Sequence, residues 1–167
     1  MKQLFFYCLI IFLFSGCKKE PSSKVEIYLL KSFTSSLDQS ITPAMVSINN
    51  AILEDAPLVT DQDIQFYTKA TTTFTLRKDI QPVIQNYGSE KAFVVTIDQK
   101  PVYFGKFHPP HLSSMVLGVA TITPFLSNKS ELKINFIHLE GNSILQQLDK
   151  RNDSQIINTF KATNRLK

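Results

Sequence analysis

The sequence predicts an α+β fold, a single domain with a mostly antiparallel sheet and two or three helices packed on it. Short stretches rich in β-branched and aromatic residues are separated by turns, and the clearest pair, 92–97 and 101–107, flanks Asp98-Gln99-Lys100 as a hairpin. Two other stretches, 79–87 and 153–166, carry apolar residues at helical spacing. Residues 25–167 have the length of one domain, and no repeat is visible.

The first elements are expected to be strands. Val25–Leu30 alternates and then becomes apolar, as a strand entering a core does. Residues 32–43 are rich in Ser and Thr and end at Pro43, which predicts a loop. Met45–Leu53 has apolar residues that would fit a helical stripe, but its flanking prolines and Asn pair favour a strand with a turn.

The next stretch carries a helix-start signal. Thr60 and Asp63 have the spacing of a helix-capping pair, which predicts a short helix through Ile64 and Phe66. Thr71–Leu76 then alternates β-branched and aromatic residues and predicts a strand.

The remaining elements follow from the same two periodicities. In the 79–87 helix Pro82 falls in the first turn, and Gly88 is placed to end the helix in the left-handed conformation. Residues 115–122 and 132–137 predict two further strands. The 153–166 helix would place four apolar residues on one face: Ile156, Ile157, Phe160 and Leu166.

The N-terminus has the layout of a signal peptide, residues 1–16. Lys2 is followed by an apolar run from Leu4 to Phe14, which is too short to span a bilayer, and then by Ser15-Gly16-Cys17. This order resembles the lipobox of bacterial lipoproteins, which implies lipidation of Cys17 and a permanent membrane anchor. Residues 17–24 are expected to form a short tether.

The lipobox resemblance implies a location in the bacterial cell envelope, with the membrane as a partner through the lipid. Lys18 is not the aspartate that holds enteric lipoproteins at the inner membrane, so the outer membrane is favoured.

The two cysteines are Cys8 and Cys17, so the domain has no thiol chemistry, disulfide or cysteine metal site. The net charge of +4 is scattered, and we expect no nucleic-acid partner.

Few residues suggest chemistry. The segment His108-Pro109-Pro110-His111, with Tyr103 close before it, predicts a stiff exposed loop that could contact a partner. The alternatives are a hydrolase or metal-dependent enzyme that uses His108 and His111 with Asp98 or His138, and an inhibitor that presents the loop to an envelope enzyme. We expect no catalytic residue, metal site or cofactor.

The stretch 56–64, the strand 73–76, the helix ending at Gly88 and the segment 92–102 together resemble the periplasmic head of the SecD protein-export subunit. The family's Asp-Gly-Lys turn appears here as Asp98-Gln99-Lys100. The resemblance spans about residues 25–107 and implies an α+β head that touches polypeptides. The ending Asp149–Asp153 resembles uncharacterised Bacteroidetes lipoproteins. The expected function is therefore that of a non-enzymatic envelope lipoprotein that binds protein or peptide.

Overall fold

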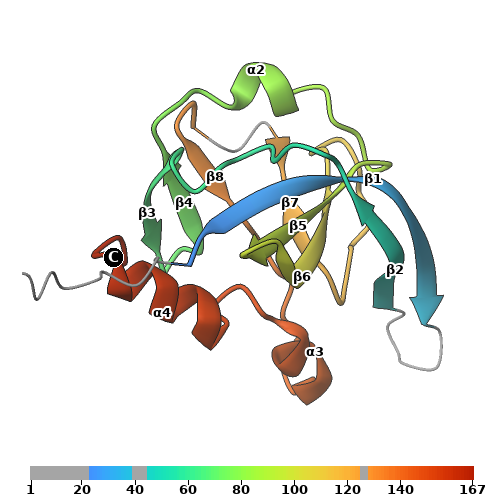
Figure 1. Ribbon diagram of the computed structural model, residues 1–167. Helices are drawn as coiled ribbons and strands as arrows, with labels where there is room; N and C mark the ends of the chain where they lie inside the picture. The colour runs from blue at the N-terminus through green and yellow to red at the C-terminus, as the bar shows by residue number, and fades with distance from the viewer. Residues whose placement is uncertain (1–22, 39–44, 125–127) are drawn as a thin grey trace, which may run out of the picture.

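The centre of the molecule is a five-stranded sheet with the strand order β2-β1-β5-β6-β7 (Figure 1). The computed structural model describes residues 23–38, 45–124 and 128–167. The five strands are β1 (Val25–Asp38), β2 (Met45–Leu53), β5 (Ala92–Ile97), β6 (Lys100–Phe107) and β7 (Ala120–Ile122). All neighbours pair antiparallel except β6 and β7, which are parallel. Every residue of β5 is buried, which confirms the predicted central strand.

The hairpin between β5 and β6 is confirmed. Asp98 and Gln99 have φ angles of 48° and 64°, the left-handed values that two-residue hairpin turns require. Asp98 tolerates this conformation well, and its Oδ1 accepts a hydrogen bond from the Lys24 backbone N–H at 2.9 Å. The turn is thereby fastened to the beginning of β1, and this contact lowers the pKa of the Asp98 carboxyl.

A second sheet has the order β3-β4-β8, with β3 (Ile64–Thr68), β4 (Thr73–Leu76) and β8 (Glu131–Lys133). Isolated bridges between Ile27 and Val59 and between Thr121 and Asn135 connect the two sheets through their flanking segments. One apolar core draws buried residues from both sheets, including Phe93, Phe74 and Leu132. The predicted single α+β domain is confirmed.

Three helices complete the described chain: α2 (Gln81–Ile84), α3 (Ser143–Leu148) and α4 (Ser154–Ala162). The side chain of Asp153 caps α4 by accepting from the Gln155 N–H at 2.9 Å. Phe160 of α4 stacks on Tyr67 of β3 at a ring-centroid distance of 5.3 Å, so this helix closes the three-stranded sheet. No helix in the described ranges has the length and apolar character needed to cross a membrane.

The predicted loop at 32–43 is wrong for residues 32–38, which continue β1. Their polar composition suggested a loop, but cross-strand pairing with β2 decides the structure: Ser35 faces Ile48, and Thr34 Oγ1 donates to Asn49 O at 3.1 Å. The rest of that prediction, 39–44, lies outside the described residues. Met45–Leu53 is a strand, as expected, with an irregularity at Asn50, whose φ is 49°.

The predicted helix through Ile64 and Phe66 is also wrong, although its start signal is real. The Thr60 N–H and hydroxyl both donate to Asp63 Oδ2, at 2.8 and 2.7 Å. The pair closes a turn, and Ile64 then begins β3 because it pairs with Leu76 of β4. Pairing across strands overrides the local helix signal here.

Other predicted elements are shorter in the structure. The 79–87 helix is reduced to α2, with Pro82 in its first turn as expected; Gly88 is not left-handed, and the described glycines with positive φ are Gly118 and Gly141. The strands predicted at 115–122 and 132–137 shrink to β7 and β8. Helix α4 ends before Leu166, which instead bridges Tyr67, so Leu166 does not share the helical face of Ile156.

Candidate functional site: an apolar cavity beside α3

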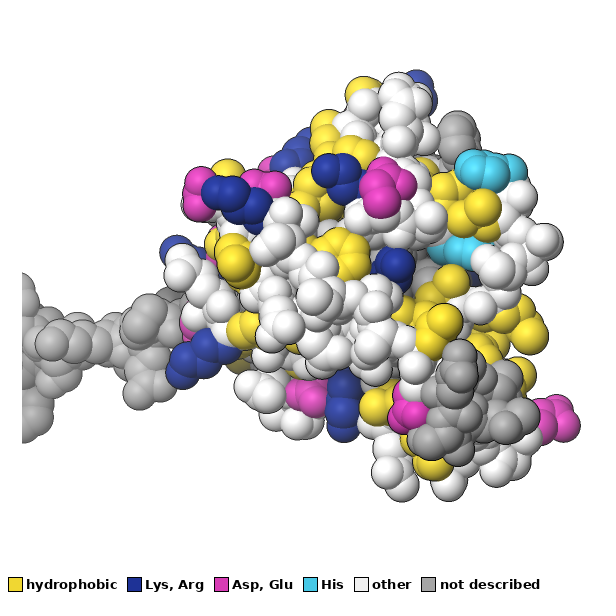
Figure 2. Space-filling model, turned by 90° about the vertical axis from the view of Figure 1, so that its right-hand side faces the viewer, with side chains coloured by type: hydrophobic (Ala, Val, Ile, Leu, Met, Phe, Trp, Pro, Cys, Tyr) yellow, Lys and Arg dark blue, Asp and Glu magenta, His cyan; other side chains and the backbone are white. Residues whose placement is uncertain are grey.

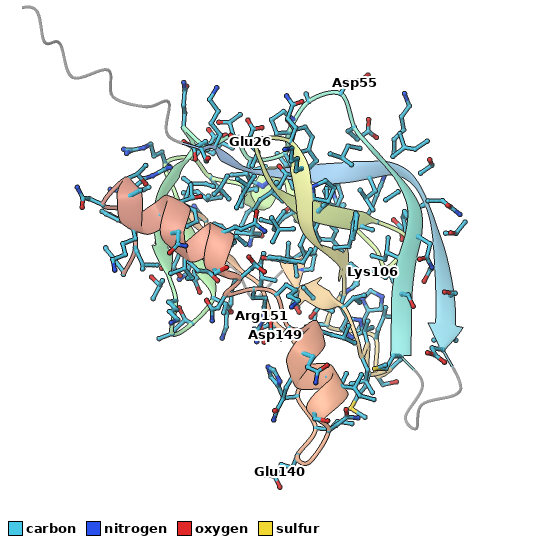
Figure 3. All side chains as sticks on the ribbon, turned by 60° about the horizontal axis from the view of Figure 1, so that its bottom comes forward. Glu26, Asp55, Lys106, Glu140, Asp149 and Arg151 are labelled. Carbon is cyan, nitrogen blue, oxygen red and sulfur yellow. The ribbon has the colours of Figure 1, made fainter. Side chains whose placement is uncertain are left out.

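An open cavity of about 410 Å³ lies between α3 and the end of the five-stranded sheet where β1 stops and β2 begins. Its walls come from Met45–Ile48 of β2, Val102–Phe104 of β6, residues 118–120, Phe136 and the α3 residues Ile144 and Leu148. Asp38, Ser47 and Lys150 add polar groups to a mostly apolar lining. Figures 1 and 3 show α3 next to this end of the sheet.

Helix α3 presents apolar side chains to solvent at the cavity. Its N-terminus is capped by Asn142, whose Oδ1 accepts from the Leu145 N–H at 3.1 Å, and Leu145 is buried. Ile144 and Leu148, four residues apart, are 43% and 42% exposed. Figure 2 looks onto the side where β1 ends and β2 begins, and shows apolar side chains exposed at several places on this face.

The opposite wall depends on Gly118. Its φ is 83°, and a Cβ there would lie 3.0 Å from both Met45 Cβ and the Val46 carbonyl oxygen. This close approach allows the Val46 N–H to donate to Leu117 O at 2.8 Å. The segment before β7 is thereby held against β2.

A charged cluster holds the C-terminal end of α3 in place. Arg151 donates from Nε and from one terminal nitrogen to the two carboxylate oxygens of Asp149, at 2.8 and 2.7 Å. The other terminal nitrogen donates to Ile134 O at 3.0 Å and to Thr72 Oγ1 at 3.1 Å. Figure 3 labels Asp149 and Arg151 at the junction of α3 and α4.

The cluster leaves Asp149 firmly ionised. Burial acts to raise the pKa of its carboxyl, but the hydrogen bonds from Arg151 outweigh burial and the pKa is lowered. His138 Nε2 lies 2.9 Å from Asp149 Oδ2 on the half-exposed side of the cluster. The arrangement joins the 134–138 segment to the chain just after α3, and both stretches contribute to the cavity, through Phe136 and Lys150.

Tyr103, expected to belong to a contact surface, is a core residue that also contributes to the cavity lining. It is 7% exposed, and its buried hydroxyl has no hydrogen-bond partner among the described residues. Burial raises its pKa well above 10, so the phenol stays protonated. Its neighbour Tyr67 differs, because the Tyr67 hydroxyl bonds Arg151 O at 2.8 Å.

The His108–His111 loop follows β6. The His108 N–H donates to Ile122 O at 2.8 Å, and the Leu112 N–H donates to Pro109 O at 3.1 Å, which closes a turn. Pro110 and His111 are exposed, whereas Pro109 is buried and His108 is half-buried with a buried Nδ1. None of the four contributes to the described cavity wall.

The structure does not bring the residues of the metal alternative together. Asp98 lies in the turn before β6 and His108 follows the far end of that strand, about 26 Å away for eight residues of extended chain. His138 is engaged with Asp149 and Arg151. Within the described ranges, no three His, Cys, Asp or Glu side chains form a group that could hold a metal ion.

Cys17, the expected lipidation site, lies outside the described residues. The sequence prediction missed α3 and the cavity. The sequence does carry a signal for α3: Asn142 is a favourable helix cap, and Ile144 and Leu148 follow it at a spacing of four residues. Comparisons with protein-family models, curated proteins and solved structures found no match, so the resemblance to the SecD head stays a prediction.

Proposed function

We propose that this protein is a lipid-anchored, non-enzymatic component of the bacterial cell envelope that binds an apolar segment of a protein or peptide. The supporting observation is the cavity beside α3. Its volume of about 410 Å³ lies in the range of ligand pockets, and its rim carries Ile144 and Leu148 partly exposed. Apolar side chains gathered at an opening are typical of an interaction site.

The polar groups around the cavity support binding over catalysis. A general base needs a carboxylate or imidazole within reach of a substrate proton. The lining has one carboxylate, Asp38, and no imidazole. Beside the cavity both carboxylate oxygens of Asp149 accept from Arg151, and the phenol of Tyr103 in the wall is buried with a raised pKa. These groups suit a fixed wall better than proton transfer.

The anchor is the second part of the proposal. The apolar run, Ser15-Gly16 and Cys17 favour diacylation of the cysteine, and two chains hold a protein on a bilayer where one does not. Metabolic labelling with a palmitate analogue tests this part. We expect label on the wild type and none on Cys17→Ser; an unlabelled wild type contradicts the anchor.

The cavity is tested by selecting displayed peptides on the purified protein and measuring Kd by calorimetry. We expect the selected peptides to carry an apolar side chain. The double variant Ile144→Asp/Leu148→Asp should weaken their binding at least tenfold, about 1.4 kcal/mol. The matched control is Val83→Asp, because Val83 on α2 is 50% exposed and does not line the cavity. Equal Kd values for the wild type and the double variant would reject the cavity as the site.

A further inference from the structure

We propose that the partner binds as an extended strand that pairs with the outer edge of β2 and places side chains in the cavity beside α3. This inference rests on the proposed function, because it specifies the conformation in which a peptide binds there. The chemistry recognised is that of an extended polypeptide, with backbone N–H and C=O groups along one side and apolar side chains at alternate positions. A lipid has no such row of backbone groups.

Strand β1 extends beyond the rest of the five-stranded sheet. Its first residues, Val25–Leu29, pair with β5, whereas from Ser32 to Asp38 its partner in the described chain is β2 alone. This part of the two strands forms a two-stranded ribbon at one side of the molecule (Figure 1), and every residue of 32–38 except Phe33 is exposed. Two-stranded ribbons are marginally stable in water, and a third strand stabilises them.

The outer edge of β2 begins to pair and then stops. The Val46 N–H donates to Leu117 O at 2.8 Å, so it points away from β1. Backbone groups of successive residues in an antiparallel strand point to opposite sides, and the register of 34–38 with 45–49 is regular. The N–H and C=O of Ile48 therefore also point away from β1. Within the described chain, neither group has a hydrogen-bond partner.

This free edge lies at the cavity. Ile48 and its neighbour Ser47 both line the cavity, whose other walls include β6 and α3. Side chains of successive residues in a strand point to opposite faces. A strand that pairs with Ile48 therefore directs alternate side chains toward the cavity, where apolar ones meet Ile144 and Leu148.

The sequence of β2 does not protect its edge against pairing. Folded proteins protect exposed edge strands with charged residues, proline, bulges or a covering segment. Met45–Leu53 contains no charged residue and no proline, and its irregularity at Asn50 lies beyond Ile48. The uncharged stretch beside the cavity thus suits a strand that accepts a partner.

The strand pairing is tested on a synthetic copy of a peptide selected on the purified protein. Each backbone nitrogen of the peptide is methylated in turn, and Kd is measured by calorimetry. Methylation removes a donor and blocks the approach of a neighbouring strand. We expect Kd to rise about tenfold at alternate positions of the paired stretch, and less than about twofold at the positions between them. A rise at every position, as for a bound helix, or at none would overturn the inference while leaving the proposed function intact.

The protein side is tested with Ile48→Pro, which removes the outward N–H and no bond to β1. We expect binding about tenfold weaker than that of the wild type. The matched control Ile48→Val keeps the N–H and should bind within about twofold of the wild type. Equal Kd values for Ile48→Pro and the wild type would overturn the inference. Thermal denaturation checks that both variants fold, and the methylated peptides decide the question on the wild type if Ile48→Pro does not fold.

Two further outcomes are distinguishable from these. A selection that yields no binding peptide would reject the proposed function, and the inference with it. A wild-type dimer in sedimentation equilibrium that Ile48→Pro dissociates would assign the edge of β2 to a second copy of this chain, and would overturn the inference.

Discussion

Helices α4 and α3 are neighbours in the chain but use their apolar residues in opposite ways. Ile156 and Phe160 of α4 are fully buried, and Phe160 packs on the aromatic rings of Tyr67 and Phe74. Helix α3 buries Leu145 and leaves Ile144 and Leu148 partly exposed beside a cavity. The apolar face of α4 is covered inside the domain, whereas that of α3 is partly open to solvent.

The largest expected difference between the two helices is the loss of stability when one of their apolar side chains is truncated. Phe160→Ala should lower the free energy of unfolding by about 3–5 kcal/mol, because it opens a hole among buried aromatic rings. Leu148→Ala should change it by less than about 0.5 kcal/mol, because nothing in the core depends on that side chain. Denaturant titration of both variants measures the difference, and losses of similar size would contradict the division between α4 and α3.

The second largest expected loss of stability comes from a substitution at the junction of α3 and α4. Arg151→Met should cost about 2–3 kcal/mol, since it leaves Asp149, Ile134 O and the Thr72 hydroxyl without their charged donor. His138→Ala is the control and should cost much less, because its pairing with Asp149 is half exposed. If the two variants lose equal stability in denaturant titration, Arg151 does not hold the C-terminal end of α3 in place.

A smaller effect distinguishes the two buried tyrosines. Tyr67→Phe should cost about 1 kcal/mol, because its hydroxyl bonds Arg151 O and Asn152 Oδ1. Tyr103→Phe should leave stability unchanged or raise it by up to about 1 kcal/mol, since it removes a buried hydroxyl with no partner in the described chain. Thermal and denaturant unfolding of both variants decide the point; a Tyr103→Phe loss as large as that of Tyr67→Phe would contradict it.

Sequence reasoning succeeded where the pattern is local. The alternation in 92–97 and the Asp98 turn predict the central hairpin, because both signals lie within a few residues of each other. It failed at Ser32–Asp38 and at Ile64, where pairing with distant strands overrides polar composition and a capping pair. The cavity was unpredictable for the same reason, because β2, β6 and α3 meet only in the folded chain.

The most direct test of the central claim is a backbone amide NMR titration of the protein with a peptide obtained from the selection. Binding in the cavity predicts the largest chemical-shift changes at Met45–Ile48, at residues 118–120 and along Ser143–Leu148, with small changes in α4. Shifts confined to the His108–His111 loop, with α3 unperturbed, would contradict the account and return the binding site to that loop.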